Sequence, residues 1–242
     1  MTRRLWLGLG VLALGSGSAW WLQLDGRHFL DSDPEAFAAL FAAPPARDSA
    51  VTRRELDELL AMQATRTAEQ IAAARADRKT DIERLYPALG FNAKTAPPLP
   101  ALHRLAQHVE TDVRIYVRAA KDRFRRLRPY EIEPRLQPCI ENVKGDLSYP
   151  SGHAAYGYAM AYLLAGLVPE RRRELVSRGE EFARQRLVCG VHFPSDLQAG
   201  DRAARILLKA MSSVPGFQTE LAGATIELRA ALGLPASTRA PQ

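Results

Sequence analysis

The stretch SYPSGHAAYGYAMAYLLAGLVP, residues 148–169, decides the fold, because the small and apolar residues that follow Gly152 predict a helix buried on all sides. Ser151 is a preferred N-cap residue. Gly152 leaves the first turn without a side chain, so the free backbone N–H groups there can bind an anion. His153 would stand beside that anion, although a single histidine at a helix start is more often a cap or a surface residue.

Helical patterns separated by prolines fill the rest of the chain. A capping-box pattern at residues 52–55 predicts a helix that continues to about residue 75. Apolar residues between 102 and 127 recur at spacings of three and four, which predicts one long amphipathic helix. That helix should end near Arg128, since Pro129 disfavours a helical conformation in the residue before it.

Three further helices are expected, over residues 170–188, 194–211 and 217–232. No segment alternates convincingly with a period of two, which is the pattern of a half-buried strand. The sequence therefore predicts an all-α fold, a single-domain helical bundle over residues 20–242 whose motifs all lie within residues 121–200.

The first 19 residues have the pattern of a secretory signal peptide. A basic start is followed by the apolar residues 5–14 and by the small residues Gly17, Ser18 and Ala19. An uncleaved anchor is the alternative, because residues 5–24 are nearly long enough to span a bilayer. The many glycines and serines favour cleavage, so we predict a periplasmic protein with no stable membrane span once the leader is removed.

Charge narrows the classes of partner. The 242-residue chain has a formal net charge of +6, which indicates anionic partners such as phosphates, nucleic acids or a membrane surface. Aromatic residues make up only 7% of the chain, and neither a basic run interleaved with aromatics nor the spacing of a zinc module is present. The sequence therefore argues against nucleic acid as a partner.

Two cysteines, Cys139 and Cys189, form the only pair in the chain. An exported protein enters an oxidising compartment, where such a pair is expected to form a disulfide bond. Two free, buried thiols are the alternative interpretation.

Lys121 and Arg128 are seven residues apart, so on one continuous helix both would project from the same face. Two cations on one face repel each other unless an anion lies between them, which makes the pair a candidate phosphate site. A solvated basic surface is the alternative, because other arginines crowd the same segment.

The stretch RLVCGVHFPSDLQAG, residues 186–200, holds a further group of candidates. His192 and Asp196 are four residues apart across Pro194, so the carboxylate can reach one ring nitrogen and leave the other free as a nucleophile or base. Arg186 offers a guanidinium suited to phosphate. A structural His–Asp pair that caps a helix is the alternative.

Together these three stretches resemble the type 2 phosphatidic acid phosphatase (PAP2) superfamily, and most closely its bacterial class A non-specific acid phosphatases. The one departure is Gln185, where the family usually has serine. The spacing of the family motifs is kept at Lys121, Arg128-Pro129, Pro150-Ser151-Gly152-His153, Gln185-Arg186, His192 and Asp196.

The resemblance implies hydrolysis of phosphomonoesters, over a broad range of small phosphorylated substrates, with no metal or other cofactor. His192, oriented by Asp196, would attack phosphorus and form a phosphohistidine, and His153 would protonate the leaving group. The phosphate oxygens would be bound by cationic side chains and the helix start, namely Lys121, Arg128, Ser151, Gly152 and Arg186.

Three alternatives remain at the level of the sequence: a vanadium-dependent haloperoxidase, a membrane lipid phosphatase, and a non-catalytic phosphate-binding envelope protein. Nothing in the residues names the leaving group of the substrate. The oligomeric state is equally open, with residues 28–100 as a candidate interface in a homo-oligomer.

Overall fold

The computed structural model describes residues 26–92, 95–141 and 146–236. The signal peptide predicted for residues 1–19 lies outside these residues. The helical elements are α1 (Pro34–Ala38), α2 (Ala50–Thr65), α3 (Ala68–Ala76), the 3₁₀ helix η1 (Ile82–Leu85), α4 (Tyr86–Leu89), α5 (Pro100–Phe124), α6 (Pro129–Ile132), α7 (Gly152–Leu167), the 3₁₀ helix η2 (Pro169–Arg171), α8 (Arg172–Val188), α9 (Pro194–Met211) and α10 (Pro215–Ala231).

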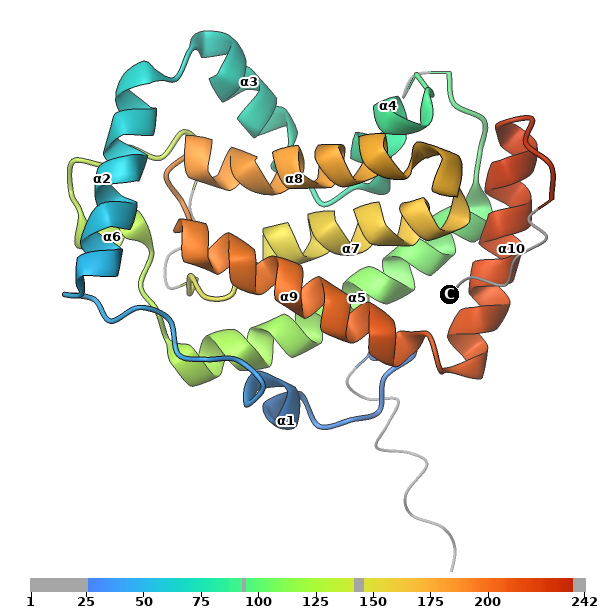
Figure 1. Ribbon diagram of the computed structural model, residues 1–242, viewed down its shortest axis with the longest axis horizontal. Coiled ribbons are helices and arrows are strands. Elements are labelled where there is room, and N and C mark those ends of the chain that lie inside the picture. Colours follow the sequence, from blue (N-terminus) through green and yellow to red (C-terminus); the bar gives the residue numbers. More distant parts are fainter. Residues whose placement is uncertain (1–25, 93–94, 142–145, 237–242) are drawn as a thin grey trace, which may run out of the picture.

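The predicted all-α fold is confirmed, since the described residues contain helices and no strand. Helix α7 lies at the centre and packs against α8, α9, α5 and α10 (Figure 1). Its residues are apolar around the whole helix, so each neighbour buries a different side of it. The main hydrophobic core therefore surrounds α7.

Small residues let α7 approach its neighbours closely. A Cβ atom added at Gly179 of α8 would lie 2.5 Å from the Cβ atom of Ala161 on α7. A Cβ atom added at Gly200 of α9 would lie 2.8 Å from the carbonyl oxygen of Ser151. These contacts bring the start of α9 against the start of α7, where two of the three predicted motifs meet.

Helix α5 ends four residues earlier than predicted. The helix stops at Phe124, because Arg125 adopts a left-handed conformation with φ of 50°. Arg128 has an extended backbone and precedes the short helix α6. The prediction that Lys121 and Arg128 share one helix face is therefore wrong, since only Lys121 belongs to α5.

The helix predicted from residue 52 to 75 is two helices. Ser49, not Thr52, caps α2, because the Ser49 hydroxyl accepts a hydrogen bond from the Thr52 N–H at 3.1 Å. Arg66 then adopts an extended conformation, and Thr67 caps α3 in a capping box with Gln70. The predicted capping box at residues 52–55 is thus replaced by two caps, one before it and one after it.

The remaining helices follow their predictions closely. Helices α8, α9 and α10 begin and end within two residues of the predicted limits, after the one-turn 3₁₀ helix η2. In the described part of the chain, every helix is too short or too polar to cross a bilayer.

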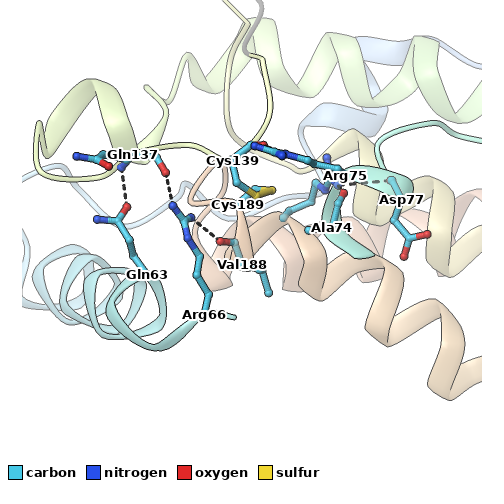
Figure 2. The surroundings of a disulfide bond; sticks show 10 residues. Gln63, Arg66, Ala74, Arg75, Asp77, Gln137, Cys139, Val188 and Cys189 are labelled. Atoms are coloured by element: carbon cyan, nitrogen blue, oxygen red, sulfur yellow. Dashed lines mark hydrogen bonds between the residues drawn. A yellow bond between two sulfur atoms is a disulfide. The ribbon is translucent and has the colours of Figure 1, made fainter. Parts of the chain in front are cut away.

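Cys139 and Cys189 form a disulfide bond, as the sequence predicts (Figure 2). The bond joins the loop after α6 to the C-terminal end of α8. Arg66, at the break between α2 and α3, supports the same junction by donating hydrogen bonds to the carbonyl oxygens of Gln137 at 2.7 Å and Val188 at 2.8 Å. Cys189, the C-cap of α8, is thereby fixed three residues before His192.

Candidate active site

A cavity of about 250 Å³ opens at the N-terminal end of α7. Six of the eight non-cysteine site residues predicted from the sequence line it, and Ser151 and Asp196 do not. Its walls come from α5, the loop around residue 146, the start of α7, the end of α8 and the α8–α9 connection. The lining residues are Arg78, Lys121, Arg128, Tyr130, Ile140, Glu141, Asp146, Gly152, His153, Arg186, Val191 and His192.

Lys121 and Arg128 meet at this cavity although they belong to different elements. Both pair with the carboxylate of Asp146, Lys121 through Nζ at 3.2 Å and Arg128 through Nη2. Lys121 also donates a hydrogen bond to the carbonyl oxygen of Leu147. Burial and the nearby charge of Arg128 lower the pKa of Lys121 to about 8. The two cations therefore hold an anion, which in this structure is a side chain of the protein.

His192 and Asp196 form the predicted pair at the start of α9. His192 Nδ1 lies 3.1 Å from Asp196 Oδ2, and both side chains are buried. Because an ionised carboxylate only accepts hydrogen bonds, this contact places the proton on Nδ1 and leaves Nε2 with a free lone pair. Ser148 also donates to Asp196 Oδ2, at 2.5 Å.

The free nitrogen of His192 faces the cation cluster. Nε2 lies 2.6 Å from Arg128 Nη1, which donates to it. Desolvation, followed by the charges of Arg128, Lys121 and Arg186, lowers the pKa of His192 well below its ordinary value. His192 is therefore neutral in mildly acidic and neutral solution, as an imidazole nucleophile has to be.

The start of α7 contributes backbone N–H groups to the cavity. Ser151 caps the helix by accepting a hydrogen bond from the Ala154 N–H at 3.2 Å. Ser151 is fully buried and does not line the cavity, so the structure places its hydroxyl at the cap and not among the predicted phosphate ligands. Gly152 does line the cavity, and a Cβ atom there would be 3.5 Å from Val117, an ordinary contact. The missing side chain thus leaves space in the cavity and is not required by packing.

His153 lies against Phe182, with the two rings stacked at a centroid distance of 4.3 Å. Its Nε2 is buried and has no hydrogen-bond partner among the described residues. Desolvation, together with the charges of Arg186 and His192, lowers the pKa of His153 well below its ordinary value. In the free protein His153 is therefore neutral, whereas the predicted proton donor has to be protonated.

Arg186 is held at the end of α8 by two carbonyl oxygens next to the C-terminus of α3. Its Nη2 donates to Ala74 at 3.0 Å and to Asp77 at 3.4 Å, while Nε has no partner among the described residues. Burial lowers the pKa of Arg186 to about 10, so it stays cationic below that pH. Gln185, the departure from the family pattern, does not line the cavity.

Several residues at or behind the cavity lack a signal that sequence reasoning could use. Asp146 and Ser148 lie just before the Pro-Ser-Gly-His motif, which is the only hint of their location. Glu55 and Arg126 belong to separate segments, and they meet only through folding. Each of these four side chains makes contact with a residue of the predicted motifs, either directly or through one partner.

The arrangement suits binding of a compact oxyanion next to a nucleophile. Four cationic side chains, among them Lys121, Arg128 and Arg186, and the N-terminus of a long helix surround a small cavity, and a neutral, oriented imidazole nitrogen lies at its edge. These are the elements needed to neutralise charge on a phosphoryl group while an atom of the protein attacks it.

Comparison with known proteins finds a related family, related sequences and a related fold. Residues 111–218 match the model of the PAP2 superfamily. The chain is 38% identical over 113 residues to the non-specific acid phosphatase of Salmonella typhimurium, covering 46% of this chain and 45% of that protein. It is 33% identical over 150 residues to the acid phosphatase of Zymomonas mobilis, covering 60% of this chain and 55% of that protein.

The match therefore spans about half the length of each of these relatives. In fold, the chain is similar to a bacterial vanadium-dependent iodoperoxidase, with a TM-score of 0.59 and 21% identity over 75% of this chain and 54% of that one. Every predicted site residue lies inside the segment that matches the family model. Residues 111–218 are thus similar to the PAP2 superfamily, and the chain is similar in sequence to the bacterial acid phosphatases over about half of its length.

Proposed function

We propose that the protein is an exported acid phosphatase that hydrolyses phosphomonoesters through a phosphohistidine on His192, with a broad range of leaving groups. The observation that carries the proposal is the neutral Nε2 of His192, oriented by Asp196 and directed at the cations of a small cavity. The similarity to acid phosphatases supports the same reaction class.

Substrate binding starts with an exchange of anions. The phosphoryl group displaces the Asp146 carboxylate from Lys121 and Arg128, and its oxygens also contact Arg186 and the Gly152 N–H. These cations supply the charge neutralisation that a phosphoryl transfer needs. The small cavity recognises the phosphoryl group itself, which is why we propose a broad range of leaving groups.

The transfer takes place in two displacements. In the first, the lone pair of His192 Nε2 forms a bond to phosphorus while the bond from phosphorus to the leaving oxygen breaks, and His153 gives that oxygen a proton. In the second, water attacks the phosphohistidine and gives a proton to His153, and the bond from phosphorus to Nε2 breaks. Asp196 stabilises the positive charge that develops on His192.

His153 acquires its proton as the substrate binds. In the free protein its pKa is low because of desolvation and the charge of Arg186. A bound phosphate adds negative charge next to the ring, which raises that pKa. The rate should consequently follow a bell-shaped pH profile on the acid to neutral side, with protonated His153 and neutral His192 in the active form.

The test is release of inorganic phosphate from an aryl phosphate at mildly acidic pH with EDTA present. We expect turnover by the leaderless protein and by His103→Ala, and none by His192→Ala. His103 is the matched control, because it is a histidine outside the cavity that bonds to Tyr86. Equal turnover by all three proteins would refute the role of His192. Halide oxidation that requires vanadate, without phosphate release, would refute the phosphatase itself.

A further inference from the structure

Behind the cavity, a set of buried charged side chains extends from α9 to α2. Arg126 lies between α5 and α6 and is 7% exposed. Its Nη1 donates to Asp196 Oδ1 and to Ser195 Oγ, both at 2.7 Å, and its Nη2 donates to Glu55 Oε2 at 2.9 Å. The guanidinium carbon lies 3.8 Å from the centroid of the Phe193 ring. Arg126 therefore joins two buried carboxylates and stacks on an aromatic ring between them.

Glu55 completes the set from α2, in a part of the chain that carries none of the three motifs predicted to form the site. Its other oxygen, Oε1, accepts a hydrogen bond from the Ser195 N–H at 2.7 Å. Glu55 thus contacts both Arg126 and the first turn of α9. A charge buried without a partner is strongly unfavourable, so the alternation of Glu55, Arg126 and Asp196 keeps each of these groups paired.

The two carboxylate oxygens of Asp196 have different hydrogen-bond partners. Oδ2 is shared by Ser148 Oγ at 2.5 Å, the Phe193 N–H at 2.8 Å and His192 Nδ1 at 3.1 Å. Oδ1 contacts Arg126. The contact with Arg126 fixes the rotation of the carboxylate, so that Oδ2 faces the imidazole.

We propose that Arg126 and Glu55 are positioning residues that hold Asp196, and through it His192, in the orientation and tautomer that the reaction needs. Neither residue lines the cavity, so neither is expected to touch the substrate. The inference rests on the proposed role of His192 as the nucleophile, and it gives α2 a function in the reaction.

Removing Arg126 should also change the titration of His192, because it removes one of the positive charges near the ring. Without Arg126 the carboxylate of Asp196 attracts a proton on His192 more strongly, so the imidazole becomes harder to deprotonate. The titratable and charged groups that face the pair are Lys121 from α5, Asp146 and Tyr149 from the loop before α7, His153 from α7, Arg186 from α8, and Arg126 and Arg128 from the α5–α6 connection.

A double-mutant cycle tests the inference with an aryl phosphate as substrate. Arg126→Met should lower kcat by roughly 10- to 100-fold and leave KM within about twofold. The double variant with Asp196→Asn should be no slower than Asp196→Asn alone, because Arg126 acts through that carboxylate. Losses that multiply in the double variant would overturn the proposal, as would a rise in KM with unchanged kcat.

The pH profile separates positioning from a merely structural role. The acid limb of kcat/KM reports deprotonation of His192 in the free enzyme. We expect Arg126→Met to move that limb upward by on the order of one pH unit, whereas a variant that only loosens the fold would leave it in place. Arg123→Met removes an exposed arginine three residues earlier and is the matched control.

Gentler variants decide the matter if Arg126→Met does not fold. Arg126→Lys keeps the charge without the planar fork that spans both carboxylates, and Glu55→Gln keeps the shape without the charge. Each should lower kcat less than Arg126→Met and leave KM unchanged, with Glu58→Gln, an exposed glutamate of α2, as the control. Wild-type kcat in both gentler variants would overturn the proposal.

A measurement without substrate distinguishes failure of this inference from failure of the proposed function. The chain has five histidines, so imidazole nitrogen NMR with His192→Ala for assignment can follow the His192 ring. The parent should show Nδ1 protonated and Nε2 free, and Arg126→Met should shift the ring toward the imidazolium at mildly acidic pH. An unchanged His192 signal in Arg126→Met would overturn the positioning role even in a protein without phosphatase activity.

Discussion

Replacement of Asp146 by asparagine tests directly whether the cavity binds phosphate through Lys121 and Arg128. In the structure the Asp146 carboxylate pairs with both cations and is about one-third exposed, at 35%. Burial opposes its ionisation, but the charges of Lys121 and Arg128 outweigh that effect and lower its pKa. The carboxylate is therefore ionised in mildly acidic solution, and a phosphate has to displace it.

The size of the effect follows from this competition. Partly exposed ion pairs contribute about 1 kcal/mol. If phosphate no longer has to displace such a pair, its binding should become roughly fivefold stronger. Asparagine has nearly the same shape as aspartate, and the backbone carbonyl of residue 146 still accepts from Arg128 Nε. We therefore expect both the KM for an aryl phosphate and the inhibition constant of inorganic phosphate to fall by about fivefold, with little change in kcat.

Steady-state kinetics with inorganic phosphate as a competitive inhibitor measures both constants. Glu141→Gln is the matched control, because Glu141 also lines the cavity, and its side chain is 90% exposed and pairs only with Arg78 among the described residues. An unchanged or weaker phosphate affinity in Asp146→Asn would refute the view that the carboxylate occupies the phosphate position.

Three other results are expected. Gly152→Ala should keep its urea-unfolding midpoint and lose roughly tenfold in phosphate affinity, whereas Gly200→Ala, whose new Cβ would meet backbone atoms, should lose about 2 kcal/mol of stability. Urea unfolding and phosphate inhibition measure the two effects, and the opposite pattern would contradict the packing. Since the pKa of Lys121 is about 8, KM should rise above that pH and be flat below it, and Lys121→Met should abolish the rise. Reducing the Cys139–Cys189 bond, which spans 50 residues, should cost about 4 kcal/mol in urea unfolding, and an unchanged midpoint would contradict this.

The parts of the site that depend on one turn of helix could be predicted from the sequence. A spacing of four residues across Pro194 places Asp196 next to His192, and Ser151 caps the helix that follows it. These contacts are set by the geometry of a single helix start. The identity of the buried helix α7 also follows from its composition, because a helix without a polar side has to lie inside the fold.

The parts that depend on a change of chain direction could not be predicted. The spacing of Lys121 and Arg128 indicates a shared helix face, but the left-handed conformation of Arg125 ends the helix between them. Both side chains still reach one cavity, because the chain turns back toward α7. An arginine rarely adopts that conformation, so the local pattern gives no reason to expect the helix to end there.

Long-range contacts between buried charges could not be predicted from the sequence either. Glu55 and Arg126 are separated by 71 residues, and nothing in the local pattern of either segment indicates the contact. Asp146 is similar, since a carboxylate in a polar loop has no periodicity that would place it between two cations. In each case the partner belongs to another segment of the chain and comes close only through folding.

The most direct test of the account is to trap the covalent intermediate. The protein is mixed with an aryl phosphate, quenched in alkali, digested and analysed by mass spectrometry, because phosphohistidine survives base and is lost in acid. We predict a phosphoryl group on the peptide that contains His192, which is absent from His192→Ala and which accumulates in His153→Ala when an activated leaving group needs no proton. A turning-over enzyme with no phosphoryl group on that peptide, or with one on a different residue, would contradict the account.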